Sequence, residues 1–536
     1  MSSKKPSDAM AKVQGPSTKV PASLEPSETV IIRSTSLLLQ HSGAIAQGKA
    51  CPMASAPWAA VPAKDTFFAL VTGANSGVGL GICQRLIDEF LTTRSLTSHL
   101  VLIPTTRDTR KSDETTAQLR KHLHKTASSA KLQARGATPE ATLSRVHILS
   151  LQLDLCNFTT IHRAAAQLVD GTVSLDGVEG GVRIPRLDAV IFNAGIGGWT
   201  GVNWLKLVHN LFTAGWIQAT TWPTFKVANA GATVNPLPQN RDDKDKEKAV
   251  VGQVFCANVF GHYLFAHAIL PLLSRRQDSS DADIPPGRLI WEGSIEAANE
   301  HFRADDLQAV RTRAAYESTK RLTDLLVLTA DLPGARAHSA PYWRLPEDDN
   351  NDNNAEGKKG TAPSPATAAA TIKPKVYLCH PGIVVTTILP LPFVLQYLWT
   401  FAAYVARWIG SPWHTNTSYN AAAAMVWLAL AAQGALDGVG AGAVKWGSAC
   451  DIRGNALVKK TEVDGWGWEG KVEDLKDDKA TGALRKIKGR KSGAQAVTEE
   501  KRVEFEETGA LCWREMEKLR VEWEARMKEA GLDGHA

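Results

Sequence analysis

The chain has 536 residues, enough for two or three average domains or for one nucleotide-binding domain with long insertions. Its formal net charge of +6 is small and is not gathered into a basic stripe, so a nucleic-acid-binding protein is not expected. The seven cysteines stand far apart without a CxxC pair, which indicates reduced thiols and excludes a disulfide framework and a zinc site.

The N-terminal region is expected to be a disordered extension over residues 1–63. It is rich in Ser, Pro and Ala and lacks the continuous apolar core of a secretory signal. Its stretch "TVIIRSTSLLLQHSGAIAQGK" contains basic residues and no acidic ones, which leaves a targeting role open.

Strands and helices alternate over an expected domain at 64–455. The run "TFFALV" predicts a first strand, and a helix follows a glycine-rich turn. Five further strands are predicted in "HLVLIPTTR", "RVHILSLQLD", "LDAVIFNAG", "GRLIWEGS" and "KPKVYLCHPG". Long helices are predicted in "GQVFCANVFGHYLFAHAILPLL" and "AAYESTKRLTDLLVLTADL". This alternation predicts an α/β fold with a Rossmann-type doubly wound parallel sheet.

Polar segments interrupt and follow this domain. We expect two insertions, near 235–250 and 346–373, the second of low complexity. Residues 456–536 are polar and charged, and we expect a separate tail that ends in an amphipathic helix. One side of that helix carries Leu511, Met516, Leu519 and Trp523.

The turn between the first strand and the first helix has the spacing TGxxxGxG. Glycines there let the backbone approach a pyrophosphate, and the free N–H groups at the start of the helix attract the anion. Any tight strand-to-helix turn favours glycine, but the position of this turn in an alternating chain favours a dinucleotide. The candidate cofactor-binding residues are Thr72, Gly73, Asn75, Ser76, Gly77, Val78 and Gly79.

The end of the second strand bears on the choice of cofactor. Arg107 stands where a cation would bind the 2′-phosphate of NADP, with Arg110 and Lys111 in support. Asp108 keeps NAD open as an alternative, because a carboxylate at this place binds the ribose hydroxyls.

Further cofactor contacts are predicted at the ends of later strands. Asp154 could accept a hydrogen bond from the adenine amino group or cap the next helix. The small residues of the Asn193-Ala194-Gly195 triplet stand where the adenine ribose must pass. After the sixth strand, backbone amides near the nicotinamide and a hydroxyl near the pyrophosphate are expected from Pro381, Gly382, Val384 and Thr386.

Tyr316 and Lys320 in "YESTK" form the catalytic pair that we predict. Residues i and i+4 share one helix face, and a nearby ammonium favours the phenolate, which lowers the pKa of a tyrosine. Ser294, at the end of the fifth strand, can hold a carbonyl oxygen toward Tyr316, and Ser318 is a weaker alternative. Asn258 is a poor helix former inside a predicted helix, which suggests that it holds a water in a proton relay to Lys320.

Together these motifs resemble the short-chain dehydrogenase/reductase superfamily over Thr66 to Ser448. Narrower segments are similar to the fungal 3-keto-sterol reductases of ergosterol synthesis, and so is the long separation between Ser294 and Tyr316. These segments are "VTGANSGVGLGICQRLI", "GVNWLKLVHNLFTAGWIQATTWPTFK", "ANVFGHYLF", "GSPWH", "KWGSACDIRG" and "LCWREMEKLRVEWE".

The resemblance implies a reaction and roles for the site residues. Tyr316 would donate a proton, Lys320 would assist it and bind ribose, Ser294 would orient the ketone, and Asn258 would serve the relay. The reaction implied is NADPH-dependent reduction of the C3 ketone of a 4-demethylated sterol of the zymosterone type to the 3β-hydroxyl. A reductase of another lipophilic carbonyl, such as retinal or a 17-keto steroid, and a scaffold protein of the C4-demethylation complex stay open.

The resemblance also implies a place in the cell and partners. The cytosolic face of the endoplasmic reticulum membrane and the lipid droplet are the expected locations. The implied partners are the sterol C4-methyl oxidase, the C3-dehydrogenase/decarboxylase, their scaffold protein and lanosterol synthase.

An apolar segment at 387–412 is expected to form a lid over the substrate. Two prolines precede a helical run from Phe393 to Gly410, which is near the lower limit for spanning a bilayer, so a transmembrane segment is the second choice. Its outer side could rest at a lipid surface through Tyr397, Trp399 and Trp408, with Arg407 reaching the headgroups.

Overall fold

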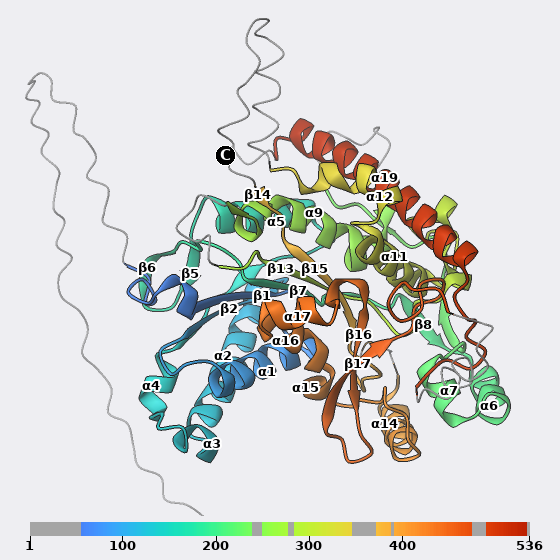
Figure 1. Cartoon of the computed structure of the whole chain (residues 1–536), viewed down its shortest axis with the longest axis horizontal. Coiled ribbons are helices and arrows are strands. Elements are labelled where there is room, and N and C mark those ends of the chain that lie inside the picture. Colours follow the sequence, from blue (N-terminus) through green and yellow to red (C-terminus); the bar gives the residue numbers. More distant parts are fainter. Residues whose placement is uncertain are drawn as a thin grey trace, which may run out of the picture. The chain divides into compact units, whose positions relative to one another are not determined.

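The computed structural model of the protein describes residues 55–237, 249–276, 284–345, 371–386, 388, 391–473 and 489–532. The expected extension up to residue 54 and most of the two expected insertions, at 238–248 and 346–370, lie outside these ranges. The described chain forms a central sheet with helices on both faces (Figure 1).

The central sheet confirms the predicted doubly wound architecture. Its strand order is β17-β16-β15-β13-β7-β1-β2-β3, with β4 paired to β2, and all pairs are parallel except β16 with β17. From β1 the chain adds β2 and β3 on one side, and it then crosses over to place β7 on the other side of β1. The switch point at which such sheets bind ligands therefore lies between β1 and β7. The strands are β1 (Thr66–Val71), β2 (His99–Thr106), β3 (Val146–Ile148), β4 (Leu151–Gln152), β7 (Ala189–Phe192), β13 (Arg288–Glu292), β15 (Lys375–His380), β16 (Lys445–Cys450) and β17 (Ala456–Thr461).

Two apolar layers hold helices against the two faces of the sheet (Figure 1). One face carries α1 (Gly77–Thr93), α2 (Thr109–Ala127), α15 (Ser418–Ala421), α16 (Ala423–Leu430) and α17 (Gln433–Gly438). The other face carries α5 (Phe158–Val169), α9 (Gly261–Ala268), α11 (Ala315–Thr329), α12 (Pro333–Ser339) and α19 (Glu499–Glu529). The first helix buries the apolar residues that recur at helical spacing in the sequence, namely Ile82, Leu86, Ile87 and Phe90.

Short elements outside the sheet shape one end of the molecule. The hairpin of β8 (Trp199–Val202) and β9 (Lys226–Ala228) encloses α6 (Trp204–Thr213) and α7 (Trp216–Thr221), and α14 (Phe393–Trp408) lies against α7 (Figure 1). The remaining pairs are β5 (Val173–Leu175) with β6 (Val178–Val182), β10 (Thr233–Val234) with β11 (Val251–Gly252), and β12 (Arg275–Arg276) with β14 (Thr371–Ile372). Two further short helices, α3 (Ala130–Gln133) and α4 (Pro139–Leu143), follow α2.

Two predicted elements are divided. The third predicted strand is split into β3 and β4, which pair with different parts of β2. The long helix predicted at 252–273 consists of α8 (Gln253–Phe255), a π-helical turn η2 (Cys256–Phe260), α9 and α10 (Leu270–Leu273). A π-helical turn inside a helix is rare and often marks a functional site, and this one contains Asn258.

Both predicted domain boundaries are corrected by packing. Trp58, inside the expected extension, is buried in the core, with its ring centroid 5.8 Å from that of Phe68. At the other end, residues 456–461 form β17 along β16, and the Trp513 indole in α19 donates to the Leu326 carbonyl in α11 over 3.0 Å. Residues 53–536 therefore make one compact unit, and the segment from 456 is no separate tail. Its helix buries Met516 and Trp523 as predicted, whereas Leu511 and Leu519 are only partly covered.

Candidate active site

The turn after β1 has a backbone that suits a bound pyrophosphate. Gly77 has φ +54°, which side chains rarely allow, and a Cβ on Gly79 would lie 2.3 Å from the Gly73 carbonyl oxygen. Helix α1 begins at Gly77, and the N-cap Ser76 makes no side-chain hydrogen bond to its first turn. The first N–H groups of α1 are thus left for an anion, and the residues fit the predicted dinucleotide. Asn75 donates to the Ser76 hydroxyl over 3.3 Å.

Thr72 lies behind this turn. Its side chain is fully buried, and its hydroxyl accepts from the backbone N–H groups of Asn193 at 3.0 Å and Ala194 at 3.1 Å. The Asn193 amide in turn donates to the Thr72 carbonyl over 2.8 Å, and His262 Nε2 lies 2.9 Å from the Thr72 hydroxyl. This hydroxyl ties the ends of β1 and β7 together, and the contact of Thr72 with the cofactor stays a prediction.

The two candidates for cofactor choice at the end of β2 have different surroundings. Asp108 caps α2: one carboxylate oxygen accepts from the Lys111 N–H over 2.9 Å, and the other pairs with the Lys111 ammonium over 2.7 Å. Arg107 is exposed, and no carboxylate in the described ranges forms an ion pair with it. Arg110 lies 3.9 Å from Glu114. The carboxylate that would serve NAD is thus occupied, whereas the guanidinium that would serve NADP is available.

Asp154 holds the turn after β4. Its carboxylate accepts from the Cys156 N–H over 3.0 Å, while α5 is capped by Asn157, whose side chain accepts from Thr159 N–H over 3.1 Å. The helix-cap alternative for Asp154 is therefore wrong. Its contact with adenine stays a prediction.

The segment after β15 offers free amides at Val384 and Thr386 in the described chain. Gly382 N–H donates to His380 Nδ1 over 3.1 Å, and Pro381 has no N–H. In the described chain the Val384 amide has no acceptor, although its neighbours donate to the carbonyls of Trp413 and Asn416. Both amides are therefore available to a carboxamide, and Val384 is the nearer of the two to the end of β15. Thr386 follows it, and its methyl would lie 3.7 Å from a Cβ on Gly77, beside the pyrophosphate turn.

The predicted catalytic residues come together at the ends of β13 and α11. Ser294 and Tyr316 line one cavity, and the Ser294 side chain acts on the Tyr316 phenol to lower its pKa, whereas Ser318 does not line this cavity. Lys320 is buried one turn along α11, with its ammonium 5.7 Å from the Tyr316 ring centroid and 2.6 Å from the Glu292 carbonyl oxygen, to which it donates.

The phenol of Tyr316 differs from the prediction in its ionisation. Burial raises the pKa of Tyr316 well above its ordinary value, and the carboxylates of Glu296, Glu292 and Glu317 add to the rise. The hydrogen bond from Ser294 lowers this pKa but does not offset the rise. The expected lowering of the pKa is thus not observed, because burial of the phenol raises it and the carboxylates that face the ring add to the rise. A protonated Tyr316 is suited to the role of proton donor.

Asn258 braces the site from η2. Its side-chain oxygen accepts from the Ile196 N–H over 2.8 Å, and its amide nitrogen donates to the Ile196 carbonyl over 3.0 Å and to the Thr319 hydroxyl over 3.3 Å. These contacts join the end of β7 to α11 next to Lys320. A Cβ on Gly195 would lie 2.8 Å from the Asn258 oxygen, so the NAG turn requires its glycine. The proton relay stays a prediction.

Buried charges near Tyr316 were missed by the sequence analysis. The Lys226 ammonium pairs with Glu296 and, over 2.7 Å, with Glu317. Burial raises the pKa of Glu296 to about 7 although Lys226 lowers it, and burial raises that of Glu292 to about 7. Sequence patterns gave no signal for Lys226, since lysines are expected at the surface.

The side chains of Ser294 and Tyr316 open into a cavity of about 140 Å³ with mostly apolar walls. These walls include Trp199, Phe225, Ile383, Ile388 and, from α14, Trp399. The helix α14 thus covers part of the cavity, as expected of a lid.

The outer face of α14 is apolar and exposed, with Tyr397 at 63% and Trp408 at 57% exposure. Arg407 is buried and packs on the Tyr404 ring, so its expected position at lipid headgroups is wrong. Within the part of the chain that the structure describes, no helix is both long and apolar enough to span a membrane.

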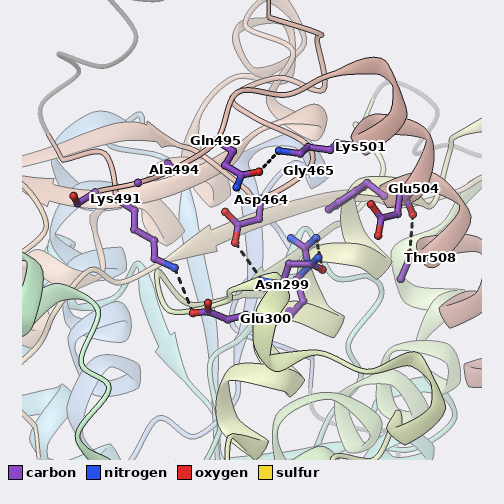
Figure 2. Close-up of a pocket in the computed structure, with 14 residues that line it drawn as sticks. Asn299, Glu300, Asp464, Gly465, Lys491, Ala494, Gln495, Lys501, Glu504 and Thr508 are labelled. Carbon is purple, nitrogen blue, oxygen red and sulfur yellow. Dashed lines mark hydrogen bonds and ion pairs between the residues drawn. The ribbon is translucent and has the colours of Figure 1, made fainter. Parts of the chain in front are cut away.

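A second cavity, of about 430 Å³, is polar (Figure 2). Charged side chains converge on it: Lys491 lies 3.6 Å from Glu300, and the Asn299 N–H donates to Asp464 over 3.2 Å. No predicted site residue lines this cavity, and its walls do not suit an apolar ligand. The candidate active site is therefore the cavity at Tyr316.

Comparison with known proteins gave close relatives. A 3-keto-steroid reductase of Gibberella zeae is 46% identical over 484 residues, which cover 88% of this chain and 97% of that protein. A 3-keto-steroid reductase of Aspergillus fumigatus is 41% identical over 473 residues, covering 86% and 95%. No family model matches. A crystal structure of 3-oxoacyl-[acyl-carrier protein] reductase from Brucella melitensis with NAD is 14% identical, covers 68% of this chain and 89% of its own, and has a TM-score of 0.33.

Proposed function

The chain belongs to the fungal 3-keto-steroid reductases, and we propose that it reduces the C3 ketone of a 4-demethylated sterol of the zymosterone type to the 3β-hydroxyl with NADPH, in ergosterol biosynthesis. The identity to two such reductases over nearly their whole length supports the activity. The observation that carries the proposal is the pairing of Ser294 with Tyr316 at the end of an apolar cavity.

The residues act on the ketone oxygen. A bound nicotinamide cofactor supplies the hydride that C3 receives. Tyr316 donates its phenolic proton to the carbonyl oxygen as that oxygen gains negative charge, and the Ser294 hydroxyl donates a hydrogen bond to it. These interactions strengthen as charge develops, so they stabilise the transition state more than the ketone. Lys320 would bind the ribose, and its positive charge would stabilise the Tyr316 phenolate that is left after proton donation.

The preference for NADPH over NADH rests on the end of β2. Asp108 is engaged by Lys111 as the cap of α2, and the Lys111 ammonium offsets its negative charge. Arg107 has no such partner in the described ranges, and a guanidinium binds a phosphate through paired hydrogen bonds. The proposal therefore assigns the 2′-phosphate to Arg107.

The size of the cavity favours substrate uptake from a lipid surface. At about 140 Å³ it is smaller than the roughly 300–1,000 Å³ of ordinary ligand pockets, so it suits the ketone end of a sterol and not the whole body. Exposed apolar residues continue outward from it on α14 and α6, among them Phe393, Phe401, Leu205 and Phe212. The Trp216 indole of α7, the helix that follows α6, contacts α14 by donating to the Ala402 carbonyl over 3.0 Å. This surface supports the proposed membrane or lipid-droplet location, whereas the proposed partner enzymes are supported by the sequence resemblance alone.

Turnover of defined ketones tests the proposal. Purified full-length protein with NADPH should reduce zymosterone, and Tyr316→Phe should be slower by about 100-fold or more because the proton donor is gone. Faster turnover of retinal or of a 17-keto steroid would contradict the substrate. Equal inactivity of both proteins, with retained binding of the C4-demethylation enzymes, would favour a scaffold.

A further inference from the structure

Lys226 connects the two elements that carry the catalytic hydroxyls. It opens β9, its side chain is only 6% exposed, and its ammonium pairs with Glu296 and Glu317. Glu296 stands two residues after Ser294, and Glu317 stands directly after Tyr316. One buried ammonium thus holds the loop after β13 and the start of α11 at a fixed separation.

The same ammonium also contacts aromatic rings. Its nitrogen lies 4.0 Å from the Trp199 ring centroid and 5.2 Å from that of Tyr316, distances at which a cation is attracted to a ring face. The Trp199 and Tyr316 centroids are 4.7 Å apart, with the rings inclined at 58°. Trp199 and Lys226 therefore form a wall that fixes the orientation of the Tyr316 ring.

The charges around Tyr316 give Lys226 an electrostatic effect as well. The charged groups that face the phenol are Lys226 from β9, Glu292 and Glu296 from β13 and its loop, and Glu317 and Lys320 from α11. The three carboxylates disfavour the phenolate, and Lys226 offsets the two with which it pairs.

We propose that Lys226 is a positioning residue of the ketone reduction, which holds Tyr316 toward the substrate and shields it from the carboxylates of Glu296 and Glu317. The inference rests on the proposed role of Tyr316. Lys226 also lines the cavity at Tyr316, and in this role it acts through Tyr316 and the Ser294 loop.

Lys226→Met tests this role in the full-length enzyme, with Lys226→Arg as the conservative variant and the exposed Lys121→Met as the control. For Lys226→Met we expect kcat for the sterol ketone to fall about 100-fold, as small misplacements of catalytic groups do, with KM little changed. Lys226→Arg should restore most of kcat. If Lys226→Met is folded and keeps the kcat of the control, the proposal is wrong.

The pH profile separates positioning from a merely structural role. Oxidation of the 3β-alcohol requires the Tyr316 phenolate to take the hydroxyl proton, so its rate rises with pH as the phenol ionises. Lys226→Met should move this rise to higher pH, because unpaired carboxylates disfavour the phenolate. Glu296→Gln should move it to lower pH, because one of these carboxylates is removed. Shifts in the same direction, or no shift in either variant, would overturn the proposal.

If Lys226→Met does not fold, Glu296→Gln still tests the proposal, because it keeps the ion pair between Lys226 and Glu317. Tyr316→Phe, assayed beside these variants, keeps two failures apart. If Tyr316→Phe is fully active, the proposed catalytic site is wrong. If Tyr316→Phe is inactive while Lys226→Met is folded and normal, only the role of Lys226 is wrong.

Discussion

The Lys445 ammonium lies 2.6 Å from the Asp324 carboxylate in the interior of the protein, directly behind the catalytic residues. It also donates to the Ser294 carbonyl over 2.6 Å, while Lys320 donates to the Glu292 carbonyl over the same distance. Two buried lysines thus hold the backbone on both sides of Gly293. The position of the Ser294 hydroxyl depends on this arrangement.

Lys445→Met should destabilise the protein strongly. It leaves the Asp324 carboxylate buried without its cation, which costs about 3–5 kcal/mol of the free energy of unfolding. The double variant Lys445→Met/Asp324→Leu should recover part of that loss, because the carboxylate is removed with its cation while the buried Lys320 and Arg321 stay. Chemical denaturation of the three proteins measures both effects. A single variant as stable as the wild type would show that the pair contributes nothing.

Arg107→Glu should reverse the cofactor preference. Hydrogen bonds to a charged group contribute about 1.5–3 kcal/mol, so we expect the Kd of NADPH to rise about 10- to 150-fold while that of NADH changes little. Quenching of protein fluorescence on titration with each cofactor measures both constants. Arg110→Glu is the matched control, since Arg110 is exposed and lies beside Glu114. Equal losses in the two variants would indicate general electrostatics and no specific phosphate contact.

Replacing exposed apolar side chains on α14 and α6 should weaken binding to lipid vesicles. Phe393→Ser/Phe401→Ser removes two side chains that are at least 60% exposed, each of which contributes about 2 kcal/mol when buried in an apolar phase. We expect vesicle affinity to fall more than 100-fold, with a similar result for Leu205→Ser/Phe212→Ser. Vesicle flotation measures the fraction of each variant that is bound to lipid. Val521→Ser on α19, also exposed, is the control, and a similar loss there would contradict a specific surface.

The His262 side chain should make stability depend on pH. Burial lowers its pKa to about 3, so between pH 6.5 and 3 the unfolded chain binds a proton that the folded protein does not. Stability is therefore lost as pH falls through this window, by about 2 kcal/mol from this residue at pH 5. His262→Gln has no such group to titrate, so its free energy of unfolding does not fall in this way. The difference in free energy of unfolding between the wild type and His262→Gln should therefore shrink by about 2 kcal/mol between pH 7 and pH 5. Urea denaturation at both values checks it, with the exposed His124→Gln as control.

Much of the fold could be predicted because its signals are local. Runs of apolar residues and helical spacing are properties of neighbouring positions, and they located β1, β2, β3 with β4, β7, β13 and β15 of the central sheet and the helices α1 and α11. The strands β16 and β17 were not predicted. Lys445, Lys459 and Lys460 give these segments a polar pattern, and the burial of Lys445 depends on Asp324, which lies 121 residues earlier.

The candidate site divides in the same way. The Gly77 turn and the Tyr316–Lys320 pair were predictable because each depends on spacing within a single turn or helix. The contacts of Thr72 and Asn258 were not, since they depend on how β7 and η2 meet β1 and α11.

The sequence by itself determined the parallel sheet, the dinucleotide turn, the catalytic tyrosine and lysine, and the family. Only the tertiary structure decided that Asp108 is held by Lys111, and that Lys226 lies buried between Glu296, 70 residues later, and Glu317. The physical reason is that local patterns follow from the repeat of a helix or strand. The ionisation of Tyr316, in contrast, is set by burial and by charges that distant parts of the chain bring to its ring.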